Sequence, residues 1–175
     1  MVNSLAGNRY AQSLIDLAKE QSQLDAVYND MLLIGSTIKE SKDLSILLNS
    51  PVVKTDKKYS VLTAVFGSKI TELTTRFLQL ISTRKREALL EAIAFSFVNL
   101  YKKEKNIVVA EVTSAVKLDD TQKQNIINLL KTDATIEMIE KIDPSIIGGF
   151  IVRVDDKQID ASVVREISNL RQALN

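Results

Sequence analysis

The stretch "NIVVAEVTSAV", Asn106–Val116, separates two kinds of sequence in this chain. Upstream of it, apolar residues recur at the spacing of amphipathic helices. Within it, β-branched residues dominate, which predicts a strand. The charged run "KKEK", residues 102–105, precedes it, and no linker rich in Pro, Gly or Ser intervenes. The sequence therefore predicts two units, residues 1–105 and residues 106–175, joined directly by the last helix of the first unit.

The first unit is predicted to contain six amphipathic helices. Asn49-Ser50-Pro51 interrupts the pattern, because the residue before proline disfavours helix. Gly67 is expected to stop the fourth helix and Ser68 to cap the fifth. Short connections between amphipathic helices favour an antiparallel bundle. The expected helices are Asn3–Glu20, a second beginning at Ser22 or Gln23, Leu44–Leu48, one from Thr55 or Asp56 to Phe66, Lys69–Thr83 with Leu80 facing inward, and Glu87–Lys103.

The second unit is predicted to be a small α+β module. Asp119 with Gln122 resembles a capping box that opens a helix reaching about Lys131. The other expected elements are strands in "ATIEMIEKI" (134–142) and "GFIVRV" (149–154), a turn at Asp155-Asp156, a return strand Lys157–Ile159, and a last helix capped by Asp160 or Ser162. The predicted fold is thus mainly α, with an N-terminal six-helix bundle followed by a small α+β C-terminal module.

Composition excludes several kinds of chemistry. The 175 residues are 45% hydrophobic, which is enough for a packed core, and they include no cysteine and no histidine. Disulfides and thiol catalysis are therefore excluded, and so are the commonest general base and metal ligand. The net charge of +1 is uneven, since residues 1–105 carry +4 and residues 106–175 carry −3. No secretion signal or membrane-spanning run is expected.

Gly148-Gly149 allows two interpretations. A phosphate-binding loop needs glycines at set spacing followed by the N-terminus of a helix. Here the pair is followed by Phe150-Ile151-Val152, which reads as a strand. The alternative is a kink or bulge, where glycine permits backbone angles that other residues rarely adopt. The order of elements favours the kink.

Other polar clusters give weak signals. Asp119-Asp120 and Asp155-Asp156 occupy turn or cap positions, where aspartate is favoured for local hydrogen bonding. The densest basic run, Arg84–Arg86, follows the fifth helix and is more typical of a solvated helix end than of a nucleic-acid site. A Ser-Lys dyad stays open from sequence alone. No catalytic, metal or cofactor residue is predicted.

Two helices carry apolar residues that suit a partner as well as a core. The first helix has an apolar stripe that covers well over half its circumference, so it can pack on two sides. The last helix places Val163, Ile167, Leu170 and Leu174 at alternating steps of four and three, which is a coiled-coil-like spacing. Both patterns favour a protein that binds partner helices.

Several stretches together resemble a known family. They are "NRYAQSLIDLA" (Asn8–Ala18), "NSPVV" (Asn49–Val53), Arg86 at the start of a long helix, and above all "IDPSIIGGFIVRVDDKQIDAS" (Ile142–Ser162). The chain resembles, over nearly its whole length, the delta subunit of F-type ATP synthases, whose mitochondrial counterpart is the oligomycin-sensitivity-conferring protein. Asp160-Ala161-Ser162 departs mildly from the Asp-Gly-Ser that is frequent in the family.

The resemblance implies a non-catalytic stator subunit, present in one copy per complex, which couples rotary proton transport to ATP synthesis. It would tie the N-terminal helix of an alpha subunit to the b subunits of the peripheral stalk. The complex would hold it peripherally at the cytoplasmic face of a bacterial plasma membrane. A groove between the first and fifth helices would bind the alpha helix through Tyr10, Ser13, Leu14, Leu17, Phe77, Leu80 and Arg84. The stalk-side module would include Gly148, Gly149, Asp160, Val163, Ile167 and Leu170.

Two other functions remain open from the residues alone. A soluble helical adaptor or nucleic-acid-binding regulator would use Arg84–Arg86 and would bind nucleic acid in a salt-sensitive way. A hydrolase would need turnover by the isolated chain. The resemblance favours the stator subunit, with no nucleic-acid partner and no cofactor.

Overall fold

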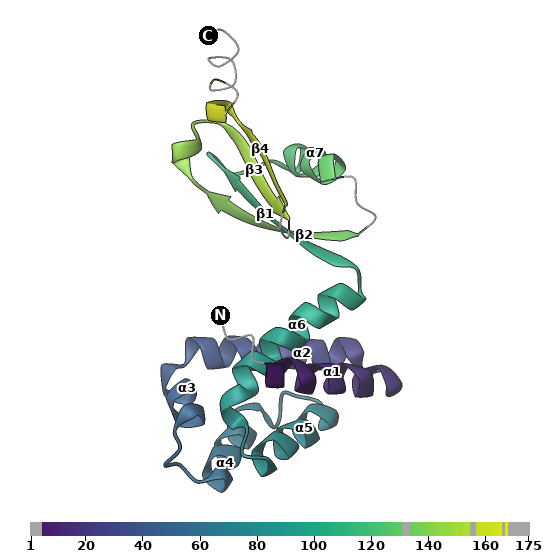
Figure 1. Ribbon diagram of the computed structural model, residues 1–175, viewed down its shortest axis with the longest axis vertical. Helices are drawn as coiled ribbons and strands as arrows, with labels where there is room; N and C mark the ends of the chain where they lie inside the picture. The colour runs from purple at the N-terminus through teal and green to yellow at the C-terminus, as the bar shows by residue number, and fades with distance from the viewer. Residues whose placement is uncertain (1–4, 131–133, 155–156, 166, 168–175) are drawn as a thin grey trace. The chain divides into compact units, whose positions relative to one another are not determined.

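The computed structural model describes residues 5–130, 134–154, 157–165 and 167 of the chain (Figure 1). The chain forms two compact units, Met1–Lys102 and Lys103–Asn175, and each is described by itself. The division falls within the last turn of helix α6 (Leu90–Glu104), whereas the sequence places the boundary after Lys105. The helix therefore runs from one unit into the other.

The first unit is a bundle of helices (Figure 1). Within the described residues it contains α1 (Leu5–Glu20), α2 (Leu24–Glu40), α3 (Lys42–Asn49), α4 (Thr55–Phe66), α5 (Glu72–Thr83) and α6, which follows the 3₁₀ turn η1 (Glu87–Leu89). Each predicted helix is present. The core consists of their apolar stripes, and its largest fully buried side chains include Leu14, Ile15, Met31, Ile34, Leu62, Phe66, Ile81 and Phe97.

Helix α5 begins later than its sequence pattern predicts. The N–H of Lys69 donates to the carbonyl of Phe66 at 2.8 Å, so this residue closes the end of α4. Thr71 is the N-cap of α5 instead of Ser68, and its hydroxyl accepts from the N–H of Thr74 at 3.3 Å. The prediction of a Ser68 cap is therefore wrong.

Gly67 ends α4, as the sequence predicts, and it does so with a right-handed φ of −54°. One further expectation for this region is corrected. Leu80 was expected to face inward, yet 47% of it is exposed. It lies on the flank of the buried stripe of α5, where a helical pattern read in one dimension cannot separate core from rim.

A buried carboxylate joins α2 to the start of α5. Asp30 is 6% exposed, and its Oδ2 accepts from the Thr71 N–H at 2.9 Å and from the Thr71 and Thr74 hydroxyls, both at 2.7 Å. These donors satisfy a buried anion next to the positive end of a helix. Asp30 thereby fixes where α5 begins.

An aromatic pair joins α2 to α6. The rings of Tyr28 and Tyr101 stack with centroids 3.8 Å apart and an interplanar angle of 16°. The Tyr101 hydroxyl donates to Oδ1 of Asp25 at 2.7 Å. That hydrogen bond, followed by burial, raises the pKa of Tyr101 to about 12. The tyrosine therefore stays protonated well above neutral pH.

The second unit is a sheet covered on one face by a helix (Figure 1). Its elements are β1 (Ile107–Ser114), α7 (Asp120–Leu130), β2 (Thr135–Ile142), the 3₁₀ turn η2 (Pro144–Ile146), β3 (Gly149–Val154) and β4 (Lys157–Ser162). The strand order is β2-β1-β3-β4, with β1 parallel to β2 and the other pairs antiparallel. The unit β1-α7-β2 is a crossover connection between parallel strands.

The core of this unit lies between the sheet and α7. Ala110, Val112 and Val152 point from β1 and β3 toward Ile126 of α7. The predicted capping box is confirmed, because the Gln122 N–H donates to Oδ1 of Asp119 at 2.7 Å and the Asp119 N–H donates to Oε1 of Gln122 at 3.0 Å. Mainly α with an α+β C-terminal module is thus the fold observed.

The return strand is longer than predicted. Strand β4 continues to Ser162 because Gly149 pairs with it at the end of the ladder. The N–H of Arg165 donates to the Ser162 hydroxyl at 3.3 Å, so Ser162 caps the helical residues 163–165. The turn predicted at Asp155-Asp156, and the positions Leu170 and Leu174 of the last helix, lie outside the described residues.

Candidate partner-binding surfaces

Helix α1 buries one half of its wide apolar stripe and exposes the other. Gly7, Ala11, Leu14, Ile15 and Ala18 form the buried half. Tyr10 is half-buried, Ser13 is exposed and Leu17 is 40% exposed, and these three lie along one flank of the helix. Leu14, at 1% exposure, supports this flank from beneath. The exposed half gives the helix an apolar edge that its own core does not use.

Helix α5 presents a similar flank. Phe77 is 8% exposed and belongs to the core, whereas Leu80 and the side chain of Arg84 are exposed. Of the residues expected to bind the alpha helix, Tyr10, Ser13, Leu17, Leu80 and Arg84 therefore reach the surface. Leu14 and Phe77 are packed inside.

The basic run Arg84–Arg86 closes the C-terminus of α5. The Arg84, Lys85 and Arg86 N–H groups donate to the carbonyls of Leu80, Ser82 and Ile81 at 3.0, 2.8 and 3.0 Å. Lys85 adopts φ +54°, in the left-handed region, which is the usual geometry of a helix C-terminus. The position matches the solvated helix end that the sequence suggests.

In the second unit, the two glycines allow a tight approach between β3 and β4. Gly149 has φ +79°, and a Cβ there would lie 2.2 Å from the carbonyl oxygen of Ala161. A Cβ on Gly148 would lie 3.2 Å from Cγ2 of Val163. Gly149 opens a strand and precedes no helix, so the kink is confirmed as the local structure.

Asp160 and Ser162 shape the turn at the end of β4. Oδ1 of Asp160 accepts from the Ser162 N–H at 3.0 Å, and its Oδ2 lies 3.6 Å from Nη1 of Arg165. Hydrogen bonding by Ser162 lowers the pKa of Asp160 below its ordinary value. The Asp160 carboxylate thus holds Ser162, which in turn caps the helical residues that follow.

Exposed apolar residues gather at one end of the sheet. We call this set the sheet-end patch; it consists of Val116, Ile142, Ile147, Val163, Val164 and Ile167, which are 68%, 61%, 76%, 38%, 45% and 48% exposed. The strand register places the ends of β1, β2 and β4 and the start of β3 together there. The sequence pointed to Val163 and Ile167 but missed Ile147, although the apolar pair Ile146-Ile147 before two glycines was a usable signal.

The described residues form no cluster of acidic side chains that could hold a metal ion. Within residues 5–130, 134–154, 157–165 and 167, no three Asp or Glu side chains are placed to hold a metal ion. Asp119 is used in its capping box. None of the helices described is both long and apolar enough to cross a membrane.

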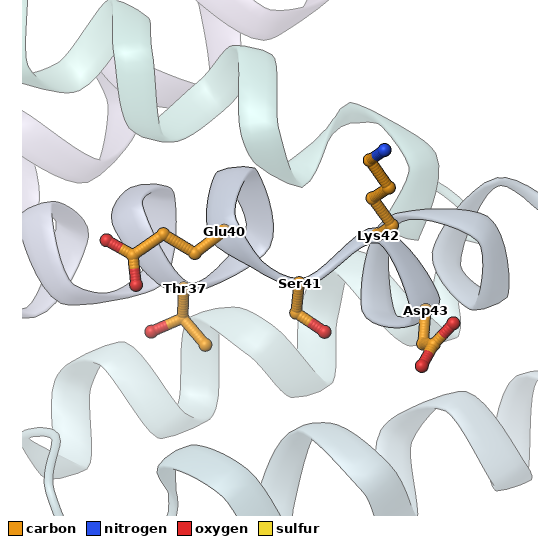
Figure 2. Close-up of a pocket in the computed structure, with 5 residues that line it drawn as sticks. All are labelled: Thr37, Glu40, Ser41, Lys42 and Asp43. Carbon is orange, nitrogen blue, oxygen red and sulfur yellow. The ribbon is translucent and has the colours of Figure 1, made fainter.

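A hollow of about 580 Å³ lies where α2 meets α3, lined by Thr37, Glu40, Ser41, Lys42 and Asp43 (Figure 2). The two hydroxyls that line it form hydrogen bonds with backbone groups. Thr37 donates to the Leu33 carbonyl at 2.7 Å, and Ser41 caps α3 by accepting from the Leu44 N–H at 3.3 Å. Figure 2 shows Lys42 pointing away from Ser41 and Asp43. Its polar groups do not converge on a ligand, so we read the hollow as a helix junction.

The comparisons agree over both units. The family model for the ATP synthase delta (OSCP) subunit matches residues 6–174. Proteins called ATP synthase subunit delta from Cytophaga hutchinsonii and Parabacteroides distasonis are 38% and 36% identical, over 93% and 95% of this chain and 90% and 94% of their own. A chain of the Toxoplasma gondii mitochondrial ATP synthase hexamer superposes with a TM-score of 0.71 at 27% identity, covering 98% of this chain and 97% of that one. This chain therefore belongs to the ATP synthase delta (OSCP) subunit family.

Proposed function

We propose that this chain is a non-catalytic stator subunit of an F-type ATP synthase. It links the N-terminal helix of an alpha subunit, at the top of the catalytic head, to the b subunits of the peripheral stalk. Rotary ion transport is then coupled to ATP synthesis, because the head cannot turn with the rotor. The complex holds the chain at the cytoplasmic face of a bacterial plasma membrane. The observation that carries this proposal is a family match that spans both units.

The distribution of apolar surface supports two separate attachments. The first unit exposes Leu17 of α1 at 40% and Leu80 of α5 at 47%, and Tyr10 of α1 is half-buried. The second unit exposes the sheet-end patch. Each buried apolar side chain contributes about 1.5–3 kcal/mol to association, so a few anchors on each unit give long residence without any chemistry.

The head-side attachment is tested by calorimetric titration of the full chain with a peptide of the alpha subunit's N-terminal helix from the same organism. We expect 1:1 binding, lowered at least about tenfold by Leu17→Asp, because a charge would replace a buried apolar contact. Tyr10→Asp should behave in the same way.

Leu32→Asp is the matched control, since Leu32 on α2 is 41% exposed, against 40% for Leu17. It should leave the affinity for the peptide within about twofold of the unsubstituted chain. Equal loss in the two leucine variants, or no binding by the folded unsubstituted chain, would exclude this surface as the attachment to the head.

A further inference from the structure

The segment that leads into β3 holds an isoleucine in a strained conformation. Ile147 has φ +67° and ψ −42°, and the N–H of Gly148 donates to the carbonyl of Ile146 at 2.7 Å. An i to i+2 hydrogen bond around these angles is the rare form of the γ-turn. A β-branched residue with positive φ costs about 1–3 kcal/mol, and such residues persist where the surroundings enforce them.

The γ-turn buries the side chain of Ile146 and exposes that of Ile147. Ile146 is 7% exposed, whereas Ile147 is 76% exposed. The backbone strain destabilises the free protein, and the exposed side chain gains no burial energy that would offset it. With three quarters of its surface exposed, the Ile147 side chain has little burial within its own unit, so the cost suits a side chain that becomes buried in a partner.

The neighbours of Ile147 extend this apolar surface. The Val163 N–H donates to the Gly148 carbonyl at 3.1 Å, and the Asp143 N–H donates to the Ser114 carbonyl at 2.8 Å. The turn is thus fastened to the ends of β1 and β4, beside Val163 and the other members of the sheet-end patch. The patch lies across strand ends and does not follow an open sheet edge, so it does not suit a partner that adds a strand.

Charge and spacing favour a helix as the occupant. Lys117, Asp143 and Arg165, near this end of the unit, include both signs of charge, and residues 106–175 carry a net charge of −3, so the unit offers no strongly basic surface for nucleic acid or an anionic membrane. Val163 and Ile167 begin a run at alternating four- and three-residue steps, the spacing with which one helix packs against another.

We propose that Ile147 is the apolar anchor of the sheet-end patch for an amphipathic helix of a stalk b subunit, and that the γ-turn presents it in advance of binding. This inference rests on the proposed function and adds to it the residue around which the stalk contact is built. Fixing the side chain beforehand lowers the entropy that binding must overcome.

The test is titration of the full chain with the soluble segment of the b subunit from the same organism, for the unsubstituted chain, Ile147→Gly and Ile147→Asn. Glycine and asparagine both tolerate positive φ, so they should relieve strain while removing the anchor. We expect each to weaken binding at least about tenfold and to leave the unfolding temperature unchanged or raise it by about 2 °C or more.

Val52→Asn is the control, because Val52 is 87% exposed in the first unit and lies outside both proposed surfaces. It should bind like the unsubstituted chain.

Unchanged affinity of Ile147→Asn would overturn the inference. Lost affinity together with a lower unfolding temperature would also overturn it, because that combination marks a structural role. Self-association of the unsubstituted chain that Ile147→Asn abolishes would also overturn it, since the occupant would be a second copy. If the folded unsubstituted chain does not bind the b segment at all, the proposed stalk attachment itself fails.

Discussion

Single residues with positive φ mark the places where this sequence departs from regular structure. Among the described residues they are Ser22, Lys85, Asn106, Ile147 and Gly149. Only Gly149 is a glycine, and only there does a neighbouring backbone leave no room for a side chain. The change in unfolding free energy on substitution at these positions can therefore distinguish the cost of a strained backbone from the cost of a steric overlap.

Gly149→Ala should destabilise the second unit by at least about 2 kcal/mol, because alanine would be strained at φ +79° and its Cβ would overlap the Ala161 carbonyl. The free energy of unfolding from denaturant titration, followed by circular dichroism, measures this loss. Gly148→Ala is the paired control, since its Cβ would meet only the end of the Val163 side chain at 3.2 Å, and it should cost clearly less. Equal losses would mean that the backbone approach is not the cause.

Lys85→Gly should stabilise the first unit by about 0.5–1 kcal/mol, because glycine adopts the left-handed C-terminal position of α5 without steric cost. Thr83→Gly, at the last helical position of α5, should instead destabilise it. Thermal unfolding of both variants gives the comparison. A loss of stability in Lys85→Gly would show that the lysine side chain contributes more than its backbone strain costs.

Among these residues, the sequence predicted the kink at the glycine pair but did not predict the positive φ of Ile147. A glycine pair before a strand predicted a kink, since glycine is the residue that such backbone angles favour. Nothing in local propensity predicts positive φ for Ile147, because a β-branched residue disfavours it. Hydrogen bonds hold the chain on both sides of it: the Asp143 N–H donates to the Ser114 carbonyl, and the Gly148 carbonyl accepts from the Val163 N–H.

Among the helices and strands, the contacts that set each boundary come from distant residues. The start of α5 shows this, because Asp30 on α2 receives the Thr71 N–H and hydroxyl. Periodicity predicted that a helix exists in this region, but its first residue depends on a partner 41 positions away. By contrast, the Asp119–Gln122 capping box is local and was predicted from spacing alone.

Asp30→Ala should cost about 2–4 kcal/mol of unfolding free energy, since it removes the acceptor of three hydrogen bonds, one of them from the buried Thr74 hydroxyl. Asp16→Ala is the control: Asp16 is exposed on α1, and in the part of the chain that the structure describes it accepts a side-chain hydrogen bond from Gln12 at 3.0 Å, so its change should stay within about 0.5 kcal/mol. Denaturant titration gives the free energy of unfolding of both variants. Similar losses in Asp30→Ala and Asp16→Ala would refute a special role for Asp30.

Tyr101 should ionise late, with a pKa of about 12. Because the folded-state pKa is raised above the ordinary value of about 10, the stabilisation is fully present below pH 10 and is lost as pH rises toward 12. Ultraviolet titration of tyrosinate should show this late step, and Tyr101→Phe should remove it. A titration with no late step that Tyr101→Phe removes would contradict the hydrogen bond from Tyr101 to Asp25.

The molecule as a whole consists of two units with different folds, and each has an apolar surface that its own core does not cover. The change from helical spacing to β-branched sequence predicted the two kinds of unit. Sequence could not separate Leu14 from Leu17, or Phe77 from Leu80, because neighbouring positions on a wide stripe become core or rim only when the helices pack. The partners themselves came from family resemblance and not from residue chemistry.

The central claim is that one chain holds head and stalk at the same time. Sedimentation velocity of the full chain, mixed with the alpha subunit's N-terminal peptide and the soluble segment of the b subunit, tests it most directly. We expect a ternary complex in which each partner binds with the affinity it shows alone, within about twofold, since separate surfaces carry the two contacts. Displacement of one partner by the other, or failure of either to bind the folded chain, would contradict a tether.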